Sequence, residues 1–283
     1  MADLTTNPLV STTWLAERVD DRGVVTLDAS WFMPAAARDP KAEFIDRHIP
    51  GARFFGIDEI CAHDSDLPHM LAAPQVFAAA LRRLGVNAHS QVVAYDSQGL
   101  FSAPRLWWNL RAMGHDQVFV LDGGLPRWIA EGRAVESGWP SPEGGDFKSH
   151  PRPELVRDLA GMHAALEGGA AQVVDARPGA RFRGETPEPR AGLRGGHMPG
   201  AISLPFDGVV SDGALRDPAE LAEIVTKAGI DVTRPIVTTC GSGISAALLA
   251  LALARLGLWD AAVYDGSWSE WGARADTPIV TGA

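Results

Sequence analysis

The sequence predicts an α/β protein made of two similar units in tandem, each a parallel sheet flanked by helices. Two observations predict this fold class. Distinctive motifs occur in the same order in both halves of the chain, and short β-rich runs alternate with amphipathic segments. The 283 residues, 46% of them hydrophobic, can supply two modest cores.

Four pairs of motifs carry the internal repeat. They are residues 26–31 with 173–178, 48–55 with 197–204, 92–114 with 236–257, and 118–128 with 262–271. The separation drifts only slightly, from 147 between Asp28 and Asp175 to 144 between Asp96 and Cys240. Such a drift, in constant order, indicates a tandem duplication with changes in the loops.

The second half shows its elements most clearly. Near-continuous apolar runs predict strands at 171–175, 202–205, 236–239 and 262–264, and the intervening patterns predict helices at 218–229 and 244–257. Gly229 and Gly257 stand where helix C-caps are expected. Strands of this kind, alternating with helices, are typical of a parallel sheet covered on both faces.

The region between the two copies is rich in turn-forming residues. Residues 137–153 contain four prolines and three glycines. We interpret this stretch as a linker between an N-terminal unit, residues 1–136, and a C-terminal unit, residues 154–283.

Composition excludes several classes of partner. The formal charge is −10 and no block of basic residues interrupts it, so nucleic acid and anionic membranes are not expected as partners. The first ten residues lack the features of a secretory signal, and the longest apolar run, 246–254, is too short to span a bilayer. With only two cysteines, neither a disulfide framework nor a zinc site is expected. The sequence therefore predicts a soluble, cytoplasmic protein without metal or organic cofactor.

The loop after the strand at 236–239 is the candidate site. Cys240 is followed by Gly241, Ser242 and Gly243, and then Ile244 and Ser245 open an alanine- and leucine-rich helix. A helix N-terminus provides unpaired N–H groups, and the glycines allow successive amides to turn toward one point. Because such a setting stabilises a thiolate, Cys240 is predicted to be a nucleophile.

Two other interpretations of Cys240 were weighed. A buried cysteine is commonly a small apolar residue, but the surrounding glycines would then have no purpose. A cysteine phosphatase would need an arginine at the end of the loop to hold phosphate, and Ala246 stands there instead. The first copy has Asp96 at the cysteine position, so it is predicted to be catalytically inactive.

Four features together resemble the rhodanese-like sulfurtransferases. They are the two-copy layout, the loop at Cys240, "DGSWSEW" at 265–271 and "RFRGETPEPR" at 181–190. The resemblance implies two rhodanese-like domains and transfer of sulfur through a persulfide on Cys240, with Gly241, Gly243, Ile244 and Ser245 forming the substrate loop. A loop without charged side chains favours the branch that takes sulfur from 3-mercaptopyruvate and passes it to cyanide, a thiol or thioredoxin.

The resemblance also implies roles for side chains outside the loop. Arg181 and Arg190 match the arginines that bind the carboxylate of the donor, for which a guanidinium fork is suited. Asp58, His69 and Ser242 match a proton relay. The alternative for the arginines is that they lie on the surface and offset Glu185 and Glu188.

Two other functions remain open from the sequence. One is sulfur transfer from thiosulfate to cyanide, which differs only in the donor. The other is a rhodanese-like module without enzymatic activity, in which Cys240 registers oxidants or supports partner binding.

Overall fold

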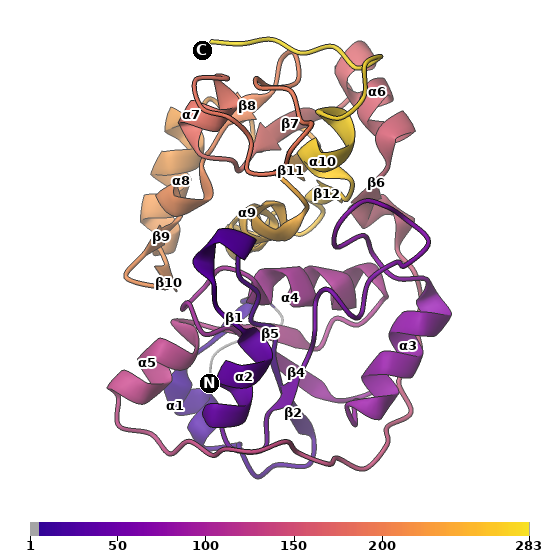
Figure 1. Cartoon of the computed structure of the whole chain (residues 1–283). Coiled ribbons are helices and arrows are strands. Elements are labelled where there is room, and N and C mark those ends of the chain that lie inside the picture. The colour runs from indigo at the N-terminus through magenta and orange to yellow at the C-terminus, as the bar shows by residue number, and fades with distance from the viewer. Residues whose placement is uncertain (1–5, 283) are drawn as a thin grey trace. The chain divides into compact units, whose positions relative to one another are not determined.

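The computed structural model describes residues 6–282, and within them the chain forms two compact units (Figure 1). The first consists of 6–62, Leu71–Arg152 and Asp212–Leu215, and the second of His63–Met70, Pro153–Ser211 and 216–282. The prediction that there is no secretory signal rests on residues 1–10. Residues 1–5 lie outside the part of the chain that the structure describes. Among residues 6–282, no helix is both long and apolar enough to cross a bilayer.

The first unit is built on a five-stranded sheet. Its strands are β1 (Leu9–Val10), β2 (Val24–Asp28), β3 (Arg53–Phe54), β4 (Gln91–Tyr95) and β5 (Val118–Leu121). They lie in the order β1-β5-β4-β2-β3, and every neighbouring pair is parallel. The carboxyl ends of β2 and β4 are therefore adjacent, which brings Asp28 and the loop at Asp96 to the same edge of the sheet.

The helices of the first unit are α1 (Thr12–Ala16), η1 (Pro34–Ala36), α2 (Pro40–Asp46), α3 (Pro74–Arg83), α4 (Ala103–Ala112) and α5 (Gly124–Ala130). Two of them, α1 and α2, begin at a side-chain cap. In α2, the Asp39 side chain accepts from the amides of Lys41 and Ala42, and Pro40 occupies the first turn, where its missing N–H has no cost. Phe44 of α2 is buried against Phe54 in the core beneath the sheet.

The second unit repeats this plan. Its sheet consists of β6 (Val156–Arg157), β7 (Gln172–Asp175), β8 (Ile202–Ser203), β11 (Ile236–Thr239) and β12 (Ala262–Tyr264). The order β6-β12-β11-β7-β8 and the parallel pairing match the first unit strand for strand. Two further short strands, β9 (Val210–Ser211) and β10 (Ala214–Leu215), belong to neither five-stranded sheet. The predicted fold class is confirmed.

One helix of the second unit is apolar on every side. The helices are η2 (Pro153–Leu155), α6 (Leu159–Gly168), α7 (Gly179–Phe182), η3 (Phe206–Gly208), α8 (Pro218–Lys227), α9 (Ile244–Arg255) and α10 (Ser267–Trp271). Every residue of α9 except Arg255 is buried, and α9 packs on β11 and β12 (Figure 1). A helix buried all round needs no polar face, which explains its composition.

The predicted elements match these bounds closely, except at the sheet edge. The strands at 236–239 and 262–264 are found as predicted, and both helices end two residues before a glycine with positive φ, Gly229 or Gly257. β6 was missed because two residues carry no alternation or apolar run that could be recognised.

The stretch interpreted as a linker has no helix or strand between residues 137 and 152. It packs along the first unit, because Phe147 is buried and meets Phe77 edge-on. Arg82 also donates to the Phe147 carbonyl at 3.0 Å. Contacts therefore group this stretch, up to Arg152, with the first unit.

Candidate functional site

Cys240 lies at the carboxyl end of β11, directly before α9. It is 2% exposed, and the backbone N–H of Gly243 donates to its sulfur at 3.1 Å. Gly243 has φ of 84°, a left-handed conformation that favours glycine, and it caps α9. The turn thus directs a backbone amide at the sulfur, as a thiolate or persulfide anion requires.

Short helix α10 holds the backbone of this loop in place. The amide of Trp268 donates to the Cys240 carbonyl at 2.9 Å, and the amide and hydroxyl of Ser269 donate to the Gly241 carbonyl at 2.9 and 2.7 Å. The Cys240 amide in turn donates to the Ser267 hydroxyl at 3.3 Å. Residues 265–271 were recognised from the sequence only as a family motif. The role of Ser267 and Ser269 in anchoring the loop was not predicted.

Two arginines approach the loop at Gly241. A Cβ atom built on this glycine would lie 3.3 Å from Nη2 of Arg181 and 3.9 Å from Nη1 of Arg190. Gly241, unlike Gly243, does not have a positive φ. A side chain here would therefore press on the Arg181 guanidinium, which would have to shift by a few tenths of an ångström.

Buried Glu188 positions Arg181. Its side chain is 1% exposed, and its two oxygens take different partners: Oε1 accepts from Arg177 at 2.8 Å, and Oε2 accepts from both Nε and Nη2 of Arg181. Arg177 also forms a bidentate pair with buried Asp175, from Nε to Oδ1 and from Nη2 to Oδ2. Burial alone would lower the pKa of the Arg177 guanidinium, but pairing with Asp175 and Glu188 raises it.

The surface interpretation describes Arg181 only in part: Arg181 does pair with Glu188, but its side chain is 19% exposed and that carboxylate is buried. It does describe Arg183, which pairs with Glu185 at an exposed position. Glu188 was considered only as a neutralising charge. The signal that could have found its role is an acidic residue between two prolines in a loop that also carries the candidate arginines.

Ser242 and His69 lie together. Nδ1 of His69 is 3.0 Å from the Ser242 hydroxyl oxygen, and both residues are buried. His69 has φ of 64°, a conformation that is uncommon for residues other than glycine and often occurs at functional sites. The third predicted member, Asp58, belongs to the first unit, where its carboxylate accepts from Nε1 of Trp31 at 3.0 Å.

The remaining predicted loop residues, Ile244 and Ser245, are the first two residues of α9 and are both buried. They lie at the helix N-terminus, whose unpaired amides and positive dipole end favour an anion.

The first copy has the same kind of loop around a carboxylate. Oδ2 of Asp96 accepts from the amides of Phe101, Ser102 and Ala103, and Oδ1 accepts from the amide of Gln98, at 2.8–2.9 Å. A side chain of the protein itself thus supplies the anion that these amides favour. No thiol is present at this position to carry sulfur.

Asp28, next to this loop, gives a testable dependence of stability on pH. Burial raises the pKa of this carboxyl group from 3.8 to about 7, although hydrogen bonds from Ser30 and Tyr95 oppose the shift. Between these two values the folded state holds more protons than the unfolded state, so stability falls as pH rises through this window. The expected loss between pH 4 and pH 8 is on the order of 4 kcal/mol at most.

The measurement is urea unfolding of the wild type and of Asp28→Asn at pH 5 and pH 8. The variant keeps a neutral side chain at both values, so its stability relative to wild type should improve at the higher pH. The same stability difference at both pH values would contradict this expectation.

Residues 11–131 and 158–274 each match the rhodanese-like domain family. The chain belongs to this family. The rhodanese-like resemblance predicted from the motifs is thus confirmed.

Rhodanese-like relatives match this chain along nearly its whole length. It is 43% identical over 277 residues to the 3-mercaptopyruvate sulfurtransferase of Escherichia coli K12, covering 98% of this chain and 99% of that protein. It is 40% identical over 275 residues to the thiosulfate sulfurtransferase of Bos taurus, covering 94% of this chain and 92% of that protein. The crystal structure of SseA, a 3-mercaptopyruvate sulfotransferase of Escherichia coli, superposes with a TM-score of 0.86 at 41% identity, covering 94% of this chain and 100% of that one.

Proposed function

We propose that the protein is a sulfurtransferase that takes sulfur from 3-mercaptopyruvate, holds it as a persulfide on Cys240, and passes it to a thiophilic acceptor. The observation that carries this proposal is the approach of Arg181 and Arg190 to the loop residue that follows the cysteine. A nucleophilic sulfur beside two guanidinium groups suits a donor that has a carboxylate at one end and sulfur at the other.

The balance of charge in the loop supports this donor over thiosulfate. Thiosulfate is a dianion without a carboxylate, so its binding would favour positive charge beside the sulfur. Residues 240–245 contain no charged side chain. The positive charge lies instead on arginines, which match the planar carboxylate and the neighbouring ketone oxygen of 3-mercaptopyruvate.

The transfer takes place in two steps. The Cys240 thiolate attacks the donor sulfur, an S–S bond forms, the C–S bond breaks, and its electron pair leaves on pyruvate as the enolate. The donor thiol gives up one proton and the enolate carbon gains one. Protons and electrons therefore balance without an outside oxidant or reductant. The acceptor then attacks the outer sulfur and restores the thiolate.

Ser242 and His69 are proposed to move that proton, with Asp58 as the third member of the relay. Their 3.0 Å contact within the second unit supports a path from the hydroxyl to the imidazole. Histidine suits this role because it can gain and lose a proton near neutral pH.

The variant Ser242→Ala should slow loading from 3-mercaptopyruvate roughly 10²–10⁴-fold, the range typical of general acid–base catalysis. Loading from thiosulfate forms no enolate, so it should change much less. Rapid-quench mass spectrometry with each donor measures both rates. Equal slowing with the two donors would contradict a proton-transfer role and indicate a binding role.

The acceptor is proposed to be cyanide, a small thiol or thioredoxin, all of which offer a nucleophile for the outer sulfur. The low cysteine count, with neither cysteine in a disulfide, supports a reducing compartment such as the cytoplasm.

The test of donor identity is the intact mass of the wild-type protein after brief exposure to 3-mercaptopyruvate or thiosulfate without acceptor. The expected result is a gain of one sulfur atom, faster from 3-mercaptopyruvate and reversed by a thiol. Faster loading from thiosulfate would assign the other donor. Failure of both donors, with ready oxidation of Cys240, would favour the non-enzymatic alternative.

A further inference from the structure

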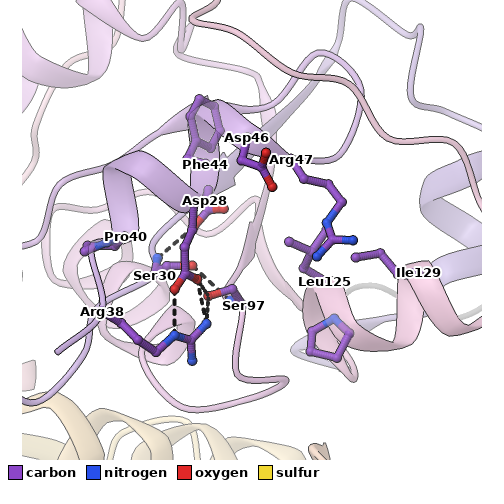
Figure 2. A pocket seen from close by; sticks show the side chains of 12 residues that line it. Asp28, Ser30, Arg38, Pro40, Phe44, Asp46, Arg47, Ser97, Leu125 and Ile129 are labelled. Atoms are coloured by element: carbon purple, nitrogen blue, oxygen red, sulfur yellow. Dashed lines mark hydrogen bonds and ion pairs between the residues drawn. The ribbon is translucent and has the colours of Figure 1, made fainter. Parts of the chain in front are cut away.

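The first unit contains a cavity of about 420 Å³ beside the carboxyl end of β2. Figure 2 shows its interior: Asp28 and Ser30 lie close to Arg38 and Ser97, with Leu125 on the other side. The proposed sulfur transfer uses none of these residues.

In the second unit, two large side chains fill the corresponding space. Arg177 forms its bidentate pair with Asp175, and its guanidinium lies 3.9 Å from the ring centre of Trp268. The carbonyl of Gly196 accepts a further hydrogen bond from Arg177 at 2.8 Å. The guanidinium of the chain itself therefore neutralises the carboxylate at the end of β7.

The cavity beside β2 and the space filled by Arg177 in the second unit lie at corresponding positions of the repeat. Ser30 and Arg177 are 147 residues apart, as are Asp28 and Asp175. Their amides make the same bond, since Ser30 donates to Oδ1 of Asp28 at 2.8 Å and Arg177 to Oδ1 of Asp175 at 2.9 Å. Ser30 is therefore the counterpart of Arg177.

Leu125 is likewise the counterpart of Trp268. The Leu125 amide donates to the Asp96 carbonyl at 3.0 Å, as the Trp268 amide donates to the Cys240 carbonyl at 2.9 Å. Serine and leucine thus replace arginine and tryptophan, and the cavity lies where the larger side chains would be.

Within residues 6–282, Asp28 has no cationic partner of the kind that Asp175 has in Arg177. It is 2% exposed, and its partners within residues 6–282 are Ser30 and Tyr95, neither of which carries positive charge. The nearby Arg38 is already paired through Nε and Nη2 with Glu43. A buried carboxylate without a cation is costly, which agrees with the raised pKa of Asp28.

The remaining charged groups of the cavity are suited to a zwitterion. Asp46 and Arg47, at the end of α2, line the cavity and form no ion pair with any residue of the described chain (Figure 2). Arg47 and Asp46 offer one positive and one negative group, which match the carboxylate and ammonium of a free amino acid.

We propose that this cavity binds a free amino acid with a guanidinium side chain, whose guanidinium pairs with Asp28 as Arg177 pairs with Asp175. The apolar side chains of Leu125 and Ile129 would contact the methylene groups of the ligand. The proposal is independent of the donor and acceptor of sulfur transfer.

The test is calorimetric titration of the full chain with L-arginine, L-citrulline and agmatine. L-Arginine should bind with a dissociation constant of about 1 mM or tighter, as its size permits. Citrulline, which has the same shape without the positive charge, and agmatine, which lacks the carboxylate, should each bind at least about tenfold more weakly, the effect of losing one charge pair.

Two variants locate the site. Ser30→Arg supplies a guanidinium from the chain, as in the second unit, and should abolish binding while raising the unfolding temperature. Asp28→Asn removes one charge pair and should weaken binding at least about tenfold. Cys240→Ser, in the other unit, should bind L-arginine as the wild type does.

Absence of L-arginine binding to the wild type, or equal binding of L-arginine and citrulline, would overturn the proposal. Retention of binding in a folded Ser30→Arg variant would overturn the assignment to this cavity. Equal affinity for agmatine would overturn the role of the amino acid head group.

Discussion

Replacement of Cys240 by serine is expected to abolish sulfur uptake. A serine hydroxyl is not ionised near neutral pH and does not form a stable adduct with sulfur, although the Gly243 amide remains in place to donate. Loss of a nucleophile costs on the order of 10⁶-fold in turnover. Intact-protein mass after exposure to 3-mercaptopyruvate should therefore show no gain.

Cys61→Ser is the matched control, because it removes the other cysteine, whose sulfur donates to the Asp58 carbonyl in the first unit. This variant should load sulfur at the wild-type rate. A sulfur adduct on Cys240→Ser, or its loss from Cys61→Ser alone, would assign the carrier role to Cys61.

Substitution of Glu188 by glutamine should strongly destabilise the second unit. The change leaves Arg177 and Arg181 without the carboxylate that they share, and breaking a buried pair in this way costs about 3–5 kcal/mol. For a unit of this size the unfolding temperature should fall by roughly 10 °C or more. Thermal unfolding followed by tryptophan fluorescence reports the change, because Trp268 stacks on Arg177.

Glu185→Gln is the control for this prediction. It removes the same charge three residues from Glu188, but its partner Arg183 is at an exposed position. Surface pairs of this kind contribute little, so the unfolding temperature should not change. Equal unfolding temperatures for Glu188→Gln and Glu185→Gln would contradict a structural role for the buried carboxylate.

The fold could be predicted because duplication doubles every signal. A single short strand such as β8 has little pattern, but the repeat of "HIPGARFF" as "HMPGAISL" places it in both halves. The edge strand β6 lacked such support, since its two residues belong to none of the recognised motifs.

The candidate site was predicted in part. Cys240 and its glycines follow from local sequence, because a strand, a turn and a helix N-terminus are adjacent along the chain. The anchoring serines of α10 were not predicted, since their roles depend on contacts with a loop 27 and 28 residues away. Glu188 was not predicted, since its sequence position does not show that its carboxylate is buried between two arginines. Alternation of apolar and polar residues says which side chains are buried, but not which buried charges meet.

The rigid mounting of Cys240 has a consequence for the second half of the reaction. The residue joins a central strand to a helix that is buried on every side, and α10 holds the carbonyls of Cys240 and Gly241. Carriers on swinging arms deliver their cargo by moving to a partner, whereas this cysteine is stationary. The acceptor must therefore travel to the sulfur, so selection among competing nucleophiles depends on their reach and size as well as on their abundance.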